Sequence, residues 1–262
     1  MNKKTSSLKC NELKLLHTKL IEMLDYIDNI CEKNNIIYWL GSGSLLGSIR
    51  HSGFIPWDDD IDIEMLREDY VKFEKALMLE KDLDYVLQTN KTDKNYISPV
   101  IKFRNVNSFT QEIDNSDINY KYRGICIDIF CIENGNHITS RLSFYFQKIL
   151  YILSKIKNDN FGILIFLKNI TFIITNRIII PSIRVVTKIC KIKSYVLPLG
   201  YGATYIFYLK DILPVSRIKF EGKNYNGPNN PHVYLKTMYK DYMQLPSENR
   251  RLTHISSYSI YK

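Results

Sequence analysis

Residues 57–64 read Trp-Asp-Asp-Asp-Ile-Asp-Ile-Glu, and this acidic stretch decides the fold and the site that we predict. Ile61 and Ile63 alternate with acids, which is typical of a half-buried β-strand. Because alternate side chains of a strand share a face, one side would carry Asp58, Asp60, Asp62 and Glu64. Carboxylates packed this closely repel one another and raise at least one pKa unless a cation neutralises them. A solvated acidic turn is the alternative, and the alternating isoleucines favour the strand.

The acidic stretch also indicates the kind of cation. Mg²⁺, or Mn²⁺ in its place, takes a few carboxylates and completes its shell with water and phosphate oxygens. We therefore expect Asp60 and Asp62 to be metal ligands and catalytic residues, with Asp58 as a supporting or alternative ligand behind them.

A second acid has the same local setting. Residues 125–130 read Ile-Cys-Ile-Asp-Ile-Phe, so Asp128 is a single carboxylate among apolar residues of a predicted strand. Such an acid either forms a buried ion pair or points into a site. Beside Asp60 and Asp62 the second reading gains weight, because metal-assisted phosphoryl transfer uses a further carboxylate as ligand or base.

Residues 41–44, Gly-Ser-Gly-Ser, lie between a predicted strand at 36–40 and a predicted helix at 45–50 that Ser42 or Ser44 would cap. Backbone N–H groups in such a turn, with a helix start behind them, can bind phosphate. A flexible turn is the ordinary reading of this pattern. About fifteen residues before Asp60, however, Gly43 and Ser44 become candidates for binding a donor phosphate.

Three basic residues are further candidates for a phosphate site. Lys102 and Arg104 alternate in a predicted strand at 98–104, so both would lie on one face. A surface ion pair is an equally good reading of these two. Arg50, near the end of the helix after the glycine turn, would bind phosphate or orient the acidic strand.

Composition limits the class of protein. The chain has 262 residues, of which 45% are apolar and 24% charged, as in an ordinary globular protein rather than a disordered or collagen-like one. Its five cysteines are too few and too scattered for a disulfide scaffold, so we expect reduced thiols. No apolar segment follows the polar, lysine-containing residues 1–10, so we expect no secretory signal and a cytoplasmic location.

The net charge of +9 comes from one segment. Residues 141–195 contain ten Lys and Arg and one acid, whereas the rest of the chain holds 26 basic and 26 acidic residues. The same segment has long apolar stretches interrupted by Lys168 and Arg177, which are costly at the centre of a membrane-spanning helix. We therefore expect an interfacial helix pair on an anionic membrane surface, with a spanning helix and an ordinary helical subdomain as the alternatives.

The overall pattern predicts an α/β (α+β) fold, a mixed sheet flanked by helices. Apolar residues at three- and four-residue intervals predict a helix at 11–33, and a second helix is expected at 67–80. Strand composition marks 36–40, 85–88, 98–104 and 124–132. We divide the chain into a catalytic core at 1–140, a basic helical insertion at 141–198 and a C-terminal segment at 199–262 that packs on the core.

These blocks resemble a known family. Gly43-Ser44, Asp60-Ile61-Asp62 and the isolated Asp128 are similar to the polymerase-β-type nucleotidyltransferase pattern. More narrowly, residues 38–62, with Gly-Phe-Ile-Pro-Trp-Asp-Asp-Asp-Ile-Asp at 53–62, resemble the LicD (phosphocholine transferase, fukutin-like) family, as do 124–130 and blocks between 220 and 254. The tail departs from the family at Lys240, where glycine is usual, and the segment 141–195 has no motif to compare.

The resemblance implies a nucleotidyltransferase-like sheet and a phosphotransferase. Such an enzyme would move a phospho-alcohol, often phosphocholine, from a CDP-alcohol donor to a hydroxyl of a cell-surface glycan such as lipopolysaccharide, teichoic acid or capsule, the acceptor being free or lipid-linked. Asp60, Asp62 and Asp128 would hold the metal ion, and Gly43 and Ser44 the donor phosphate. The implied setting is the inner face of a bacterial plasma membrane, with no nucleic-acid partner.

Two other functions fit parts of the sequence. Asp58-x-Asp60 and Asp60-x-Asp62 also match the DxD metal motif of glycosyltransferases that use nucleotide sugars, although such an enzyme would need neither Gly43-Ser44 nor Asp128. A non-catalytic protein that binds membranes or nucleic acid through the basic segment is the other alternative.

Overall fold

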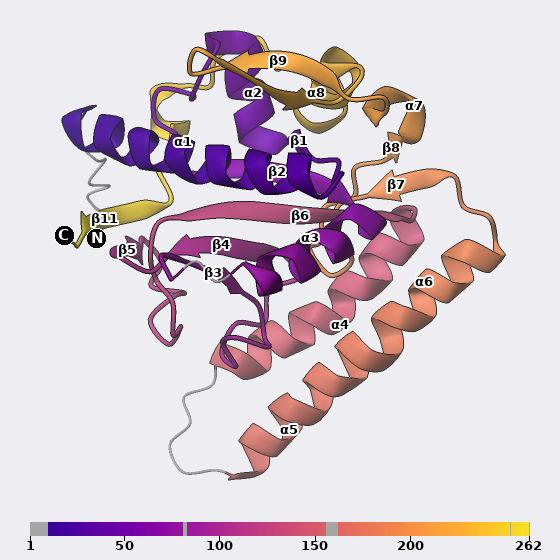
Figure 1. Ribbon diagram of the computed structural model, residues 1–262. Coiled ribbons are helices and arrows are strands. Elements are labelled where there is room, and N and C mark those ends of the chain that lie inside the picture. Colours follow the sequence, from indigo (N-terminus) through magenta and orange to yellow (C-terminus); the bar gives the residue numbers. More distant parts are fainter. Residues whose placement is uncertain (1–9, 81–82, 156–161, 252, 262) are drawn as a thin grey trace.

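The computed structural model describes residues 10–80, 83–155, 162–251 and 253–261 (Figure 1). It confirms an α/β fold in which helices flank a curled mixed sheet. The helices are α1 (Cys10–Lys33), α2 (Ser42–His51), α3 (Arg67–Leu79), α4 (His137–Lys155), α5 (Gly162–Ile173), the π-helical turn η1 (Ile174–Ile179), α6 (Ile180–Ile189), α7 (Leu209–Ile212), α8 (Pro231–Tyr239) and the 3₁₀ turn η2 (Glu248–Arg250).

The strands form one large sheet and two small ones. The seven-stranded sheet contains β1 (Trp39–Leu40), β2 (Ile61–Leu66), β3 (Tyr85–Gln88), β4 (Ile101–Asn105), β6 (Cys126–Asn134), β7 (Ser194–Val196) and β8 (Phe207–Tyr208). The two-stranded sheets pair β5 (Ser108–Glu112) with β11 (Ile255–Ile260), and β9 (Ser216–Phe220) with β10 (Lys223–Gly227).

In the large sheet β2 and β6 are parallel neighbours at the centre of the order β1-β2-β6-β4-β3. β1, β4 and β3 join antiparallel, and β7 pairs with the end of β6. The register sets Asp62 directly opposite Asp128 and Asp128 directly opposite Lys102. Three chemically active side chains therefore stand in one row across three strands.

One face of the sheet is covered by α1 and α3. Leu16, Leu20, Leu24 and Ile27 of α1 are fully buried, as their three- and four-residue spacing predicts. They pack against the isoleucines of β2 and β6, including Ile61 and Ile127. Since alternate residues of a strand face opposite ways, burial of the isoleucines turns Asp62 and Asp128 to the other face.

The opposite face carries α2, α8 and part of the C-terminal segment. Leu45 of α2, Trp39 of β1 and Tyr234 of α8 belong to a second buried cluster there, together with Phe130, Ile132, Leu197, Phe207 and Leu235. The cluster fills one end of this face and leaves the acidic end to polar side chains. One face of the sheet is therefore apolar throughout, whereas the other face is apolar at one end and acidic at the other.

Two details differ from expectation. β2 begins at Ile61, so Asp58 and Asp60 precede the strand and only Asp62 and Glu64 alternate within it. Helix α2 begins at Ser42, with Gly41 as its N-cap and no side-chain cap, so neither Ser42 nor Ser44 caps the helix as we predicted. The acids ahead of the strand are held instead by a turn, in which the Asp58 N–H donates to the Ile55 carbonyl at 2.8 Å.

The basic segment forms a long helical pair. Figure 1 shows α5, η1 and α6 running as one rod diagonally beside α4, at an edge of the molecule. Helix α4 begins at His137, three residues before the boundary that we proposed at residue 140. The division of the chain into three parts stays a prediction.

Candidate active site

Asp62 and Asp128 meet across the central strand pair. They are register partners on parallel strands, and neighbouring strands lie about 4.8 Å apart, so the two carboxylates face the same side at close range. The β-strand alternation that the sequence showed at both positions is what brings them together. Stretches more than sixty residues apart in the chain therefore converge on one point, as the sequence predicted.

Asp60 and Asp58 approach the same point from the turn before β2. The Asp60 carboxyl interacts electrostatically with Asp128, and Asp58 and Asp60 share a hydrogen bond. A methyl group added to Gly43 would lie 3.1 Å from Asp58 Oδ2 and 3.6 Å from Asp62 Oδ2, so both carboxylates border this glycine. Four acids thus line one corner of the sheet.

Burial and mutual repulsion raise the pKa values of three of these acids. Burial, together with the neighbouring Asp128 and Asp59, raises the pKa of Asp60 to about 6, although His254 and Lys102 act against the rise. Burial and mutual repulsion also raise the pKa values of Asp58 and Asp62 well above the ordinary range. A cation that binds beside these acids would stabilise their ionised forms and so lower the free energy of the site.

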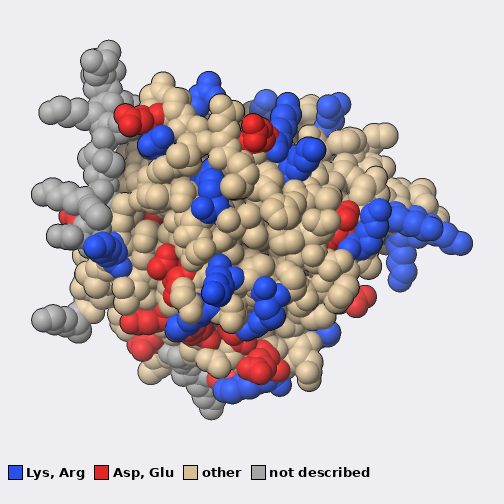
Figure 2. Space-filling model, turned by 90° about the horizontal axis from the view of Figure 1, so that it is seen from above, with Lys and Arg blue, Asp and Glu red and all other residues tan. Residues whose placement is uncertain are grey.

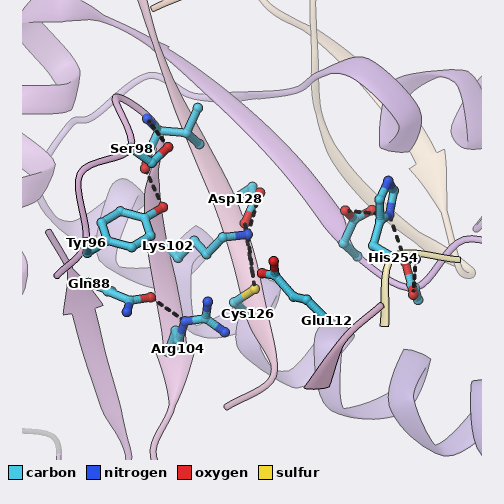
Figure 3. Close-up of polar contacts among 12 residues, drawn as sticks. Gln88, Tyr96, Ser98, Lys102, Arg104, Glu112, Cys126, Asp128 and His254 are labelled. Carbon is cyan, nitrogen blue, oxygen red and sulfur yellow. Dashed lines mark hydrogen bonds and ion pairs between the residues drawn. The ribbon is translucent and has the colours of Figure 1, made fainter. Parts of the chain in front are cut away.

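Lys102 is held by Asp128. Its ammonium donates to Asp128 Oδ1 at 2.7 Å and Oδ2 at 2.9 Å, and lies 3.7 Å from Cys126 Sγ (Figure 3). The side chains are 19% and 16% exposed, so water screens the pair little. The sequence suggested that Lys102 binds phosphate or forms an ion pair, and the second arrangement is the one observed. Its ammonium nonetheless stays beside the acidic corner.

Arg104 lies in a different environment. It is 1% exposed, its Nε donates to Gln88 Oε1 at 2.5 Å, and Nη1 donates to the Gly124 carbonyl at 2.7 Å (Figure 3). These bonds tie β4 to β3 and to the start of β6. The shared strand face with Lys102 is as predicted, but the guanidinium is buried away from solvent: Nε and Nη1 donate to protein groups, and Nη2 has no hydrogen-bond partner among the described residues. The role of Arg104 is therefore structural here, in place of the predicted phosphate contact.

Arg50 remains near the acids. Its Nη1 donates to the Tyr242 carbonyl at 3.0 Å and its Nε to His51 Nε2 at 2.9 Å, while Asp58 interacts with it electrostatically. The side chain is half-buried at the end of α2. Arg50 therefore links α2 to the C-terminal segment and lies beside Asp58.

The glycine turn is bonded to the acidic strand. The Gly43 N–H donates to Asp62 Oδ2 at 3.2 Å, and the Asp62 N–H donates to Ser44 Oγ at 2.8 Å. The Ser42 N–H donates to Glu64, which lies fully buried behind it and also accepts from Trp39 Nε1 at 2.9 Å. The positive end of α2 thus points at the acids, and the turn holds Asp62 in place.

Sequence reasoning gave Asp59 no role, yet it anchors the C-terminal segment. The Asp59 carboxylate is buried and accepts the backbone N–H groups of His254 and Ile255 at 2.7 and 2.8 Å. His254 Nδ1 contacts Asp59 Oδ1 at 3.0 Å and Asp60 Oδ2 at 3.5 Å, and these acids raise its pKa to about 10. Of the three consecutive aspartates, Asp58 and Asp60 therefore face the acidic corner, and Asp59 holds the C-terminal segment.

Two tyrosines were also missed. Tyr201 interacts with Asp62, Asp128 and Asp60, and Tyr239 interacts with Asp62 and Asp58, so both phenols border the acidic corner. Both side chains are exposed. Gly200 and Gly202, at φ 94° and 98°, flank Tyr201 and allow the sharp path that carries it there. That Gly-Tyr-Gly sequence was the available signal.

The donor set fits a hard divalent cation. Asp60, Asp62 and Asp128 offer oxygen ligands, and burial together with the neighbouring acids raises the pKa values of the first two. Mg²⁺ and Mn²⁺ prefer oxygen ligands of this kind. Ligand atoms of Asp58, Asp59, Asp60 and His254 also lie within 4.8 Å of one another. Asp62 and Asp128 lie outside that group: Asp62 accepts the Gly43 N–H, and both Asp128 oxygens accept from Lys102, so a cation bound by Asp60, Asp62 and Asp128 would have to compete with the Lys102 ammonium.

In this fold, carboxylates on adjacent strands face a glycine turn at a helix start, which is the arrangement that the nucleotidyltransferase resemblance leads us to expect. Residues 35–156 match the sequence profile of the family described as LicD/FKTN/FKRP, nucleotidyltransferase domain. The resemblance to the LicD family is thus confirmed over this stretch, which is just under half of the chain.

Two kinds of relative support that resemblance. Lipopolysaccharide cholinephosphotransferase LicD of Haemophilus influenzae is 29% identical over 254 residues, which cover 89% of this chain and 92% of the relative. Ribitol 5-phosphate transferase FKRP of human and mouse is 44% identical over 50 residues, 19% of this chain and 10% of the relative. The first likeness extends over nearly the whole chain, and the second is confined to a short block.

Proposed function

We propose that this enzyme transfers a phospho-alcohol from a CDP-alcohol to a hydroxyl group of a cell-surface glycan, with Mg²⁺ or Mn²⁺ as cofactor. The observation that carries the proposal is the register of Asp62 opposite Asp128, beside Asp60 and the start of α2. The full-length likeness to a lipopolysaccharide cholinephosphotransferase supports phosphocholine as the first group to test.

The residues divide the chemistry among them. Asp60, Asp62 and Asp128 would hold the cation, which when bound neutralises charge on the donor diphosphate. The acceptor oxygen forms a bond to the phosphorus that carries the alcohol, the bond from that phosphorus to CMP breaks, and a carboxylate of the site takes the hydroxyl proton. Asp128, which Lys102 holds beside the other acids, would serve as ligand or base.

We propose that several groups bind the donor. Arg50 and Lys102 bring positive charge to the edge of the acidic corner, where phosphates would lie. Gly43 and Ser44 bring the start of α2 to the same corner. The exposed rings of Tyr201 and Tyr239 can stack on a base or contact a quaternary ammonium group.

The acceptor and location follow from the same proposal. Both named relatives transfer phospho-alcohols, and one of them acts on lipopolysaccharide. We place this enzyme in the cytoplasm, at the inner face of a bacterial plasma membrane where lipid-linked glycans are assembled. Nucleic acid is not a proposed partner, and Figure 2 shows Lys and Arg interspersed with Asp and Glu on the face seen from above, which does not favour a nucleic-acid surface there.

The test is release of CMP from a panel of CDP-alcohols, beginning with CDP-choline, with purified acceptor glycan and Mg²⁺. We expect CMP release to fall on the order of a thousandfold in Asp62→Asn and Asp128→Asn, while Glu248→Gln, a 92% exposed acid outside the site, stays at the wild-type rate. Unchanged rates in both aspartate variants would contradict the proposal. Release of UDP from a UDP-sugar, without CMP release from any CDP-alcohol, would establish the glycosyltransferase alternative.

A further inference from the structure

The rod formed by α5, η1 and α6 presents a long apolar face to solvent. Over Gly162–Ile189 the most apolar window has a mean hydropathy of 1.8, yet only 11% of that window is buried. In α5 no residue is buried. The exposed large apolar residues are Ile163, Ile165, Phe166, Leu167, Ile170, Ile173, Ile174, Ile178, Val185, Val186 and Ile189.

The other face of the rod is attached to the protein. Thr175, Ile180, Ile183 and Thr187 are buried, and the five-residue step from Thr175 to Ile180 spans the π-helical turn. The wider turn keeps this inner row facing inward along the rod. At its far end Arg184 forms a bidentate ion pair with Glu133 of β6, with Nη2 to Oε1 at 3.0 Å. Along η1 and α6 the exposed face is therefore held outward by contacts on the opposite side.

The charges of the rod have one sign. Residues 162–193 contain six Lys and Arg and no acid. Arg184 is paired with Glu133, whereas Arg177, Lys188, Lys191 and Lys193 are exposed. On α4, beside the rod, Arg141 and Lys148 are exposed as well. A partner for this surface must offer an apolar interior edged by negative charge.

We infer that the exposed face of α5–α6 binds the surface of an anionic lipid bilayer, with its isoleucine and phenylalanine side chains in the interfacial region and the lysines at the headgroups. Isolated exposed apolar residues are ordinary, but a contiguous apolar helix face with a basic border is typical of an interfacial helix. Each Lys or Arg near an anionic surface adds about 1 kcal/mol, or about fivefold in partitioning.

The rod binds along the surface and does not span the bilayer. To span, it would have to release the buried inner row and break the Arg184–Glu133 pair, leaving a buried carboxylate uncompensated. A second copy of the chain fits the apolar face less well, because two such faces would bring Arg177 and the terminal lysines of each copy together. The bilayer satisfies both the apolar face and the charges.

The experiment measures co-flotation of the full chain with vesicles of phosphatidylcholine alone and with 30% phosphatidylglycerol. We expect binding to the anionic vesicles only, weakened at high salt. The double variant Phe166→Glu/Ile170→Glu should lower the partition coefficient at least tenfold, and Lys188→Gln/Lys191→Gln about 25-fold by the value above. Neither pair touches the acidic corner, so CMP release with a water-soluble acceptor should not change.

A control and two contrary outcomes make the test decisive. Met78→Glu/Leu79→Glu replaces exposed apolar residues on α3, away from the rod, and should leave flotation unchanged. Absence of flotation with anionic vesicles overturns the inference, and so does equal binding by the wild type and the Phe166/Ile170 variant. A concentration-dependent dimer in sedimentation, abolished by that same variant, would overturn it in favour of a second copy.

Discussion

Asp62 and Asp128 stand opposite each other, but their neighbours differ. Asp62 accepts the Gly43 N–H, whereas both oxygens of Asp128 accept from the Lys102 ammonium. The site therefore has one carboxylate held by a helix start and one held by a cation of the protein. In this arrangement Lys102 supplies part of the positive charge that four crowded acids require.

Lys102→Met tests this balance. Removing one partner of a mostly buried pair leaves Asp128 uncompensated, so we expect the free energy of unfolding to fall by about 3 kcal/mol in the absence of metal, and Mg²⁺ to restore part of the loss. Urea unfolding with and without Mg²⁺ measures both effects. Lys19→Met, which removes a more exposed pair with Glu22 (side chains 25% and 54% exposed), should cost less than about 1 kcal/mol. Equal losses in the two variants would show that the Lys102 pair has no special weight.

His17 predicts a pH dependence of stability. Its ring stacks on Phe54 with centroids 3.7 Å apart, and burial lowers its pKa below 6.5. The folded protein therefore binds this proton more weakly than the unfolded chain. Its contribution to stability is complete above about pH 6.5 and is lost as the pH falls through that value toward the lowered folded pKa.

His17→Phe keeps a ring against Phe54 and removes the titration. We expect the wild type to lose more stability than His17→Phe between pH 7.5 and 5.5, as measured by urea unfolding at each pH. Parallel pH profiles for the two proteins would show that His17 does not contribute.

Helix α2 contains two glycines, Gly43 and Gly47, with different structural roles. A Cβ at Gly47 would lie 2.4 Å from the Gly53 carbonyl oxygen, a backbone atom that cannot easily move. A Cβ at Gly43 would lie 3.1 Å from a carboxylate oxygen of Asp58, which can move. The first glycine serves packing, and the second keeps the acidic corner open.

The corresponding alanine variants should separate these duties. Gly47→Ala should lower the free energy of unfolding by about 1–3 kcal/mol. Gly43→Ala should change it by less than about 1 kcal/mol, since alanine favours a helix, but should reduce CMP release strongly. Thermal unfolding and the release assay on the same preparations measure both. A stable Gly47→Ala, or a fully active Gly43→Ala, would contradict the assignment of that glycine.

The elements that the sequence predicted are those with a strong apolar period. α1, α3 and β3 follow their expected ranges within a residue or two. In the two helices the buried positions recur at regular spacing, and β3 is a short run of β-favouring residues. β5, β9, β10 and β11 were not predicted, since strands such as Lys-Asn-Tyr-Asn-Gly at 223–227 carry mostly polar residues. Their pairing is decided by contacts with distant segments, which local composition does not record.

Some residues of the site could be predicted from local sequence patterns, and others are brought there only by contacts between distant segments. Asp62 and Asp128 could be found because each lies among isoleucines in its own stretch. The contacts of Asp59 with His254 and of Tyr239 with Asp62 join segments more than 170 residues apart, so no local pattern indicates them; the Gly-Tyr-Gly sequence marks a sharp turn at Tyr201 but not which acids it approaches. Arg104 shares its strand face with Lys102, but only the packing of β3 shows that it is buried.

The crowding of acids makes metal binding depend on pH. Burial and the neighbouring acids raise the pKa of Asp60 to about 6, so this carboxyl is mostly protonated at pH 5 and mostly ionised at pH 8. A cation must displace protons at the lower pH, so we expect 5 mM Mg²⁺ to raise the melting temperature clearly at pH 8 and little at pH 5. Differential scanning fluorimetry measures this, and an equal shift at both pH values would contradict it.

The most direct test of the acidic corner is a Mn²⁺ titration of the whole protein, followed by electron paramagnetic resonance at pH 8 with CDP-choline present. We predict that the wild type and Glu248→Gln bind Mn²⁺, and that Asp62→Asn and Asp128→Asn each weaken this binding at least tenfold while remaining folded. Undiminished Mn²⁺ binding in both aspartate variants would contradict the account.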